Sequence, residues 1–297
     1  MADSEPKVLI DGLVFGEDPR WHDGALWFSD IHGQQIHRAE IDGAGELKRH
    51  DVIANVAEAP SGLGWLPDGT LIVVAMESQK LFRLDGSGAF HLHADCSHLA
   101  RGSLNDMIVR SDGTAYVGDM GSRIFSEHPD HSVPGQTLRV SPDGTVSCAA
   151  DNLKSPNGHV LSDDESVLYV AESGGGRVLA FDVQPDGTIT GQRVFADLPP
   201  AADLPIAPPD GICLDAEGAI WAADPIGRRV IRVRAGGELT QVVEFSGRVP
   251  VAVVLAGPDR RTLIACVADH WKRDEVLKAR TGQIVALTVD VPGAGKP

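Results

Sequence analysis

Short apolar segments that each end in an acidic residue recur six times along the chain. They read ALWFSD, LIVVAME, AYVGD, LYVAE, IWAAD and LIACVAD, and they end at Asp30, Glu77, Asp119, Glu172, Asp224 and Asp269. Each follows a turn rich in Asp or Gly, residues that bond their own backbone or tolerate positive φ. A segment with period-two alternation, such as RVIRV, follows each of them. This pattern is typical of antiparallel hairpins repeated along a chain.

Six units of about 50 residues, each a small antiparallel sheet, predict an all-β fold, a six-bladed β-propeller with a central channel. The N-terminal segment KVLIDG reads as a strand without a partner in its own unit. We therefore expect it to close the ring by pairing in the last blade, so that residues 1–297 form a single domain. The one candidate helix, HWKRDEVLKAR near residue 270, is expected to be a short loop helix.

The composition restricts the possible binding partners more than it restricts the possible folds. The 297 residues carry a net charge of −16, which disfavours nucleic acid because phosphate binding needs a Lys/Arg surface. No apolar run approaches the roughly 20 residues of a membrane span, and the N-terminus lacks a signal-peptide apolar core. A cytoplasmic location is expected. The four cysteines form no CxxC pair and suit small buried residues in a reducing compartment.

The residue that opens the innermost strand changes from unit to unit. In chain order these positions hold Glu17, Ser61, Asn105, Asn157, Asp210 and the region of Pro250. Equivalent positions of a propeller meet around the mouth of its channel. Four of them supply carboxylate or amide oxygens and none supplies sulfur, which suits one hard divalent cation, Ca²⁺ before Mg²⁺ or Mn²⁺ and with Zn²⁺ less favoured. Any one of these residues alone is typical of a turn.

The same stretches carry a resemblance to a known family. EDPRW followed by LWFSDI, SPNG followed by LYVAES, and PDGICLD followed by IWAAD resemble the motifs of the SMP-30/gluconolactonase/regucalcin family, and the resemblance runs through all six units. It implies a six-bladed propeller with lactone-hydrolase activity and a divalent metal held by Glu17, Asn105, Asn157 and Asp210. Diisopropylfluorophosphatase, a more distant organophosphate-hydrolysing relative, resembles the chain in the same four-oxygen pattern.

One position departs from the family pattern. Sugar-lactonase members carry a substrate-holding arginine two residues before the asparagine that corresponds to Asn105, and this chain has a serine there. The departure favours a less hydroxylated or more hydrophobic lactone or ester over a sugar lactone. The candidate substrate-binding residues are Ser103, Arg101, Asp119, Met120, His159, His270 and Trp271.

The favoured function is metal-assisted hydrolysis of a lactone, with Asp210 as the base toward water or as the nucleophile. A serine esterase is disfavoured because the chain has no GxSxG motif. The alternatives are a phosphotriesterase-like hydrolase, a non-catalytic calcium-binding propeller and an interaction platform. The expected partner is a small-molecule lactone or ester, without nucleic acid or membrane, and the expected state is a monomer or weak homo-oligomer.

The acids that end the six strands have two interpretations. They form a second cation site, or they bond backbone amides at the blade corners, and the second interpretation is favoured, with Asp119 as the exception that faces the pocket. Two long connections, 123–136 and the Pro-rich 197–211, are expected to be rim segments because loops of such length are often lids.

Overall fold

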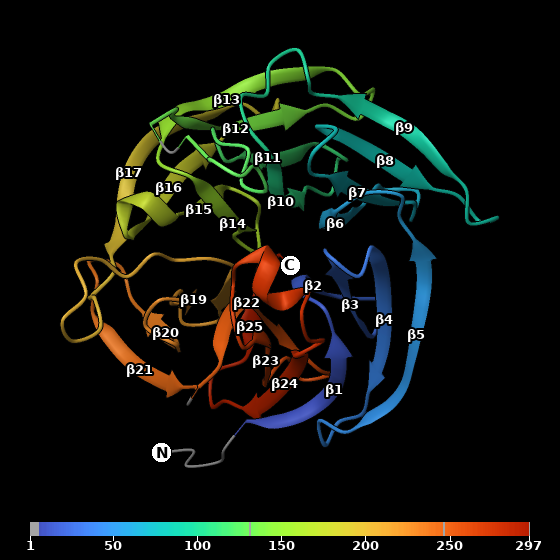
Figure 1. The fold of residues 1–297 in the computed structure, drawn as a ribbon. Helices are drawn as coiled ribbons and strands as arrows, with labels where there is room; N and C mark the ends of the chain where they lie inside the picture. Colours follow the sequence, from blue (N-terminus) through green and yellow to red (C-terminus); the bar gives the residue numbers. More distant parts are fainter. Residues whose placement is uncertain (1–5, 131, 246, 297) are drawn as a thin grey trace.

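Six antiparallel sheets stand around one axis in the computed structural model, which describes residues 6–130, 132–245 and 247–296 (Figure 1). The sheets follow one another in chain order, and the innermost strand of each packs against those of its neighbours. The prediction of an all-β six-bladed propeller is confirmed. Within the described ranges, no helix has the length and apolarity needed to cross a membrane.

Each blade runs from an inner strand to an outer one. The inner strands of blades 1 to 6 are β2 (Gly16–His22), β6 (Pro60–Trp65), β10 (Leu104–Val109), β14 (Pro156–Leu161), β18 (Ile212–Asp215) and β22 (Val249–Ala256). The second strands are β3 (Ala25–Asp30), β7 (Leu71–Ala75), β11 (Ala115–Asp119), β15 (Val167–Glu172), β19 (Ile220–Asp224) and β23 (Thr262–Ala268). The third strands are β4 (Gln35–Ile41), β8 (Lys80–Leu84), β12 (Gly135–Val140), β16 (Arg177–Val183), β20 (Arg229–Val233) and β24 (Gly282–Thr288). The outer strands are β5 (Leu47–Asn55), β9 (Phe90–Asp95), β13 (Val146–Leu153), β17 (Ile189–Asp197), β21 (Leu239–Glu244) and, in blade 6, β1 (Lys7–Leu13).

The N-terminal strand closes the ring, as the sequence predicts. β1 pairs antiparallel with β24, so that both ends of the propeller share blade 6. The short helix expected near residue 270 is α1 (Arg273–Val276), and a 3₁₀ turn lies at Ser173–Gly175. Both lie in connections between a second and a third strand.

The inner strands are irregular where they open the channel. The pairing of β2, β6, β10 and β14 with their neighbours shifts register directly after Glu17, Pro60, Leu104 and Pro156. Such bulges re-aim side chains, and here they fall at the positions that the sequence singles out.

The same part of the channel is narrow. A Cβ on Gly158 would lie 2.7 Å from the Ile212 nitrogen, so β14 and β18 approach as closely as they do only because this residue is glycine.

Gly62 supports a test of this close packing. Its Cβ would lie 2.6 Å from both the Cβ and the backbone nitrogen of Met107 on the next inner strand. Gly62→Ala should therefore lower the free energy of unfolding by about 1–3 kcal/mol, the usual cost of overpacking. Urea denaturation measures the change. Gly86→Ala is the matched control, since a Cβ there meets nothing within 4 Å, and an equal effect of the two substitutions would contradict the packing argument.

The C-terminal segment lies inside the ring, which the sequence did not predict. β25 (Gly293–Ala294) pairs with β18 on the side away from β19, and so stands on the inner edge of blade 5. Lys296 continues to blade 4 and forms a bridge with Leu161. Figure 1 shows the C-terminus at the centre of the propeller. Both contacts are with inner-strand residues remote from the bulges, so this segment fills part of the opposite end of the channel.

The acids that end the second strands mostly bond backbone amides. Asp30 accepts from the backbone nitrogens of Val14 and Phe15, which tie blade 1 to the strand that closes the ring. Glu172 and Asp224 each accept from a backbone nitrogen and an arginine. These contacts agree with the interpretation as blade-corner residues. Asp269 differs, since it pairs with Arg248.

Candidate functional site

Oxygen-bearing side chains of adjacent inner strands are linked by hydrogen bonds across the channel. The Ser61 hydroxyl donates to Asn105 Oδ1 at 3.1 Å, and Asn105 Nδ2 donates to Asn157 Oδ1 at 2.9 Å. The Asn157 side chain in turn bonds the Asp210 carboxylate. These hydrogen bonds thus connect blades 2 to 5, at the end of the channel where the inner strands shift register. The structure brings these predicted residues together as the repeat implies.

Glu17 completes this set from blade 1. Burial raises the pKa of the Glu17 carboxyl well above its usual value, and the neighbouring carboxylates of Asp210 and Asp106 raise it further. Burial and Asp106 likewise raise the pKa of Asp210, against the lowering effect of its bond from Asn157. Glu17, Asn105 and Asn157 are buried, whereas Asp210 keeps more exposure. The carboxylates therefore lie close enough to repel one another in a poorly hydrated site.

Three further charged residues belong to this site, and the sequence analysis missed them. Asp18 accepts from the Leu63 backbone nitrogen and lies 2.5 Å from an Arg20 nitrogen, and Arg20 also donates to the Met107 carbonyl at 2.6 Å. Burial raises the pKa of Asp18 to about 8 and that of Asp106 to about 6, although Arg20 lowers both.

A signal for the two aspartates was present in the sequence. The residue after the strand-opening position is glycine in SGL, NGH and DGI, but aspartate in EDP and NDM. At this register glycine allows close strand packing, as Gly158 shows. A charged residue in its place is an exception that points to a local electrostatic role.

The donor set fits a hard divalent cation. The cluster holds four carboxylates, those of Glu17, Asp18, Asp106 and Asp210, against the single guanidinium of Arg20. Asp106 Oδ1 is buried and has no hydrogen-bond partner among the described residues. No group of three or more His, Cys, Asp or Glu side chains in the described ranges has metal-binding geometry. A cation here would therefore need the amide oxygens of Asn105 and Asn157 besides the carboxylates, which suits Ca²⁺ better than zinc.

Loops from three blades meet over this end of the channel. Phe125, in the long connection of blade 3, lies 4.9 Å ring to ring from His32 of blade 1, and Phe15 lies 5.9 Å from the same imidazole. Arg273 of α1 in blade 6 is near enough to His32 to help burial lower its pKa to about 4. The predicted rim segment 123–136 thus reaches across to blade 1; its residue 131 lies outside the described residues.

The second rim segment, 197–211, leads directly into the site. It forms no strand between the end of β17 and the start of β18. The Pro209 carbonyl accepts a hydrogen bond from Ser173 Oγ at 2.6 Å, and the Asp210 nitrogen donates to the Ala223 carbonyl at 3.0 Å. These bonds anchor Pro209 and the backbone nitrogen of Asp210 itself.

Three of the predicted substrate contacts are occupied by protein groups. The Ser103 hydroxyl donates to Glu77 and accepts from the Ile124 nitrogen. Arg101 donates to Asp151 at 2.6 Å and to the Pro134 carbonyl. Asp119 is buried and accepts four hydrogen bonds, from the backbone nitrogens of residues 101, 102 and 121 and from Gln136. These bonds assign Asp119 to the blade corner, like Asp30, Glu172 and Asp224, and the expectation that it faces the pocket finds no support in them.

The remaining four predicted contacts divide between the interior and the surface. His159 is buried beside the ring, with Nε2 3.1 Å from Thr137 Oγ1 and with Nδ1 lacking a hydrogen-bond partner in the described structure. Burial lowers its pKa to about 4, so it is a neutral imidazole. Met120 is partly buried. Trp271 is 50% exposed beside Lys272, and His270 accepts from the Lys272 nitrogen, so both belong to the surface of the blade 6 loop.

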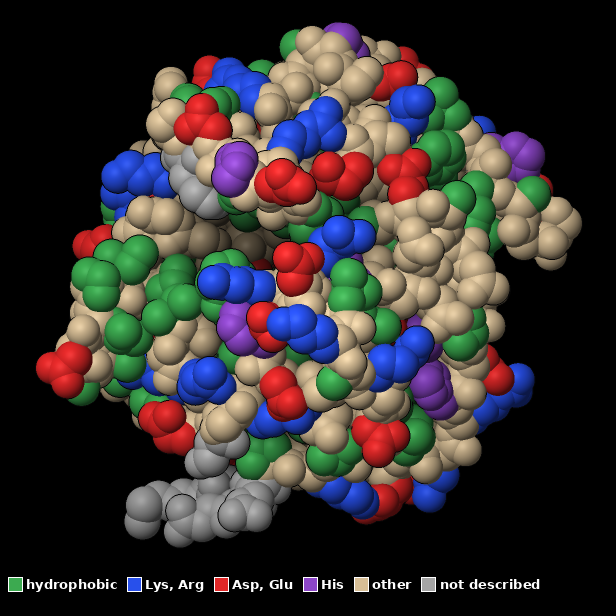
Figure 2. Space-filling model, in the orientation of Figure 1, with side chains coloured by type: hydrophobic (Ala, Val, Ile, Leu, Met, Phe, Trp, Pro, Cys, Tyr) green, Lys and Arg blue, Asp and Glu red, His purple; other side chains and the backbone are tan. Residues whose placement is uncertain are grey.

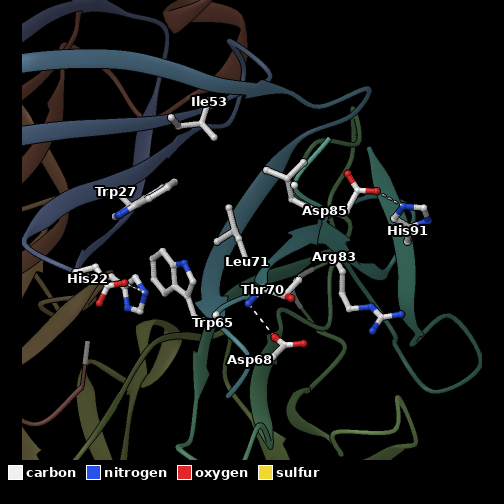
Figure 3. Close-up of a pocket in the computed structure, with 14 residues that line it drawn as sticks. His22, Trp27, Ile53, Trp65, Asp68, Thr70, Leu71, Arg83, Asp85 and His91 are labelled. Atoms are coloured by element: carbon white, nitrogen blue, oxygen red, sulfur yellow. Dashed lines mark hydrogen bonds and ion pairs between the residues drawn. The ribbon is translucent and has the colours of Figure 1, made fainter. Parts of the chain in front are cut away.

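A cavity of about 660 Å³ lies away from this site, between blades 1 and 2 (Figure 3). Trp27 and Ile53 of blade 1 face Trp65 and Leu71 of blade 2 across it, and the His22 imidazole stacks on Trp65 at 3.8 Å. Its aspartates are engaged locally, since Asp68 accepts from the Thr70 nitrogen and Asp85 bonds His91. Its lining contains none of the converging oxygen-bearing residues described above. The face seen in Figure 2 carries acidic and basic side chains interspersed, without a broad region of one sign.

The chain shares its architecture with solved propellers. The calcium-binding protein regucalcin from Agrobacterium tumefaciens strain C58 superimposes with a TM-score of 0.78 at 24% identity, over 98% of this chain and 96% of that one. A luciferin-regenerating enzyme also superimposes with a TM-score of 0.78, at 21% identity and with 98% of each chain covered. At these identities the likeness concerns the fold.

Sequence comparison identifies relatives over nearly the whole chain. The 6-deoxy-6-sulfogluconolactonase of Pseudomonas putida is 24% identical over 98% of this chain and 96% of its own length. The L-arabinolactonase of Azospirillum brasilense is 28% identical over 83% and 79% of the two chains. Regucalcin from Xenopus laevis is 26% identical over 95% and 94%. The family model described as the SMP-30/gluconolactonase/LRE-like region matches residues 15–268, and the chain belongs to this family.

Proposed function

We propose that the protein is a divalent-metal-dependent hydrolase that opens a lactone ring. The observation that carries the proposal is the convergence of Glu17, Asn105, Asn157 and Asp210 in one cluster, in which Asp210 raises the pKa of Glu17 and Asp106 raises the pKa of both. Lactonases among the relatives support the reaction class, and the regucalcin relatives support a divalent cation, with Ca²⁺ the preferred one.

The four side chains would hold the cation, which when bound supplies a Lewis acid that polarises a carbonyl and stabilises the developing oxyanion. Asp210 accepts the proton of the attacking water, since it is the most exposed member of the set. Asn157 orients the Asp210 carboxylate through its hydrogen bond. The contact of Phe125 with His32 limits the entry of bulk water from the rim.

The reaction itself has a direct test. The protein, stripped with EDTA and reloaded with Ca²⁺, Mg²⁺, Mn²⁺ or Zn²⁺, is assayed for acid release from a panel of lactones. Activity that disappears on stripping and returns best with Ca²⁺ is expected. Undiminished turnover in the metal-free protein would refute metal dependence, and binding of Ca²⁺ without hydrolysis of any lactone would leave a calcium-binding propeller as the function.

The preferred substrate is a lactone or ester with few hydroxyl groups. Ser103 stands where sugar-lactonase relatives carry an arginine, and its hydroxyl already bonds Glu77 and the Ile124 nitrogen. The nearby Arg101 already donates a hydrogen bond to Asp151. Ile124 and Phe125 at the rim pack against the apolar core that includes Met76 and Val276. Donors that already bond protein groups gain little from substrate hydroxyls, whereas an apolar wall gains from an apolar ring.

Comparison of two substrates checks this preference. Dihydrocoumarin should be hydrolysed with a kcat/KM about ten-fold or more above that for gluconolactone, since one or two apolar contacts are worth about 1–3 kcal/mol. Ser103→Arg should move the ratio toward gluconolactone. A clear preference of the wild-type protein for gluconolactone would show that another donor takes the place of the missing arginine.

A further inference from the structure

A second cavity, of about 360 Å³, lies at the opposite end of the channel from the oxygen ligands. It is lined by the far ends of three inner strands, at Trp21, Trp65 and Val109, and by Gly295 and Lys296 of the C-terminal segment. Trp21 lies four residues after Glu17 on β2, beyond the register shift, so the cavity and the oxygen ligands lie at different levels of the channel, with Arg20 between them. We call it the lower vestibule.

The charges of the vestibule have one sign. Its lining includes four cationic residues, Arg20, Arg110, Arg260 and Lys296, and no Asp or Glu, although the whole chain carries a net charge of −16. Acids hold some of these cations from outside the lining: Lys296 pairs with Glu165, and Arg110 lies 2.9 Å from Asp112. Cations fixed in this way around a concave surface favour a negatively charged occupant.

Arg20 supplies an independent sign of an occupant. Its side chain is 6% exposed, and its Nε has no hydrogen-bond partner among the described residues. Its terminal nitrogens are used by Asp18 and by the carbonyls of Pro19 and Met107. A buried donor without an acceptor is costly, and a ligand or an ordered water satisfies it.

Apart from His22 and Ser111, the rest of the lining is apolar. Trp21, Leu63, Leu66, Val109 and the indole of Trp65 form walls beside the cations. The His22–Trp65 stack stands between this cavity and the one in Figure 3, since both residues line both. A volume of 360 Å³ falls at the lower end of the range for small-molecule sites.

We propose that the lower vestibule binds a small organic anion, with a carboxylate or phosphate head on the cations and an apolar body against the tryptophans. The proposed anion site shares no oxygen ligand with the cation site, and Arg20, which bonds Asp18, lies between the two. The C-terminal segment forms one wall, because Arg260 donates to the Gly295 carbonyl at 3.1 Å and thereby holds that segment in the channel.

Calorimetry with phenylacetate, phenyl phosphate and the neutral 2-phenylacetamide tests the proposal on the full chain. Both anions should bind and the amide should bind at least ten-fold more weakly, and the tighter anion identifies the head group. Lys296→Gln and Arg260→Gln should each weaken anion binding about ten-fold, as expected for loss of a charge-assisted contact. Arg83→Gln, which lines the other cavity, is the matched control and should bind as the wild type does.

Several results would overturn the proposal. If the neutral amide bound as tightly as the two anions, charge would not contribute to binding. If inorganic phosphate bound as tightly as phenyl phosphate, the apolar walls would not contribute. Loss of anion binding in Glu17→Gln, or on EDTA treatment, would place the anion at the metal site instead. Wild-type affinity in both Lys296→Gln and Arg260→Gln, each with an unchanged circular dichroism spectrum, would exclude the vestibule.

Discussion

Asp210→Asn should lower kcat/KM for lactone hydrolysis at least about 100-fold while the propeller stays folded, because general-base contributions alone amount to about 10²–10⁴. Glu17→Gln should have a comparable effect through weaker cation binding, since each substitution removes one of two carboxylates from a set otherwise made of amides. Activity assays and calorimetric titration with Ca²⁺ measure the two losses.

Asp23→Asn is the matched control for Asp210→Asn. The Asp23 carboxylate is 90% exposed, and its backbone has φ of +46°, which asparagine tolerates as well as aspartate does. The control should retain activity and Ca²⁺ affinity. Wild-type Ca²⁺ affinity in both Glu17→Gln and Asp210→Asn would show that the cation is held elsewhere.

The stability of the metal-free Asp210→Asn protein should change in the opposite direction from its activity. A carboxyl whose pKa is raised in the folded state destabilises that state once it ionises. Burial and Asp106 both raise the pKa of Asp210. The neutral amide removes this cost, so the variant should melt higher than the wild type, with a difference that grows as the pH rises above about 4, the unfolded pKa of Asp. Saturating Ca²⁺ should reverse the order by stabilising the wild type.

The repeat made the fold and the convergence of the strand-opening residues predictable. Six strands with the same ending place equivalent residues at one level, so the convergence of Asn105, Asn157 and Asp210 followed from register alone. The N-terminal strand was also readable, because KVLIDG alternates and lacked a partner.

Other features of the site could not be read from the repeat. β25 has two residues, too few to show any periodicity, and its place inside the ring depends on tertiary contacts with Leu214 and Asp215. The engagement of Ser103 by Glu77 is likewise a contact between blades 2 and 3 that no local pattern encodes. The position of Arg20 beside the converging carboxylates has the same origin, since its partner Met107 lies 87 residues away.

Removal of residues 1–12 should lower the melting temperature by about 5 °C or more. The deletion takes away most of β1, including the buried Ile10, and leaves the edge of β24 open. Loss of one buried Ile side chain costs about 2–5 kcal/mol, and each kcal/mol corresponds to about 2–4 °C in a large domain. Calorimetry measures the shift, and size-exclusion chromatography reports association through the exposed edge.

Two substitutions within β1 separate ring closure from the mere loss of chain. Ile10→Ala removes a side chain that is 5% exposed and packs in the core, whereas Val8→Ala removes one that is 46% exposed on the same strand. The first should reproduce much of the destabilisation and the second should stay within about 0.5 kcal/mol of the wild type. A deletion that stops at residue 5 leaves β1 whole and should melt like the full chain. If the 1–12 deletion also melted like the full chain, β1 would contribute nothing to closing blade 6, and the ring would be held by the contacts of β2 with β22, β23 and β24.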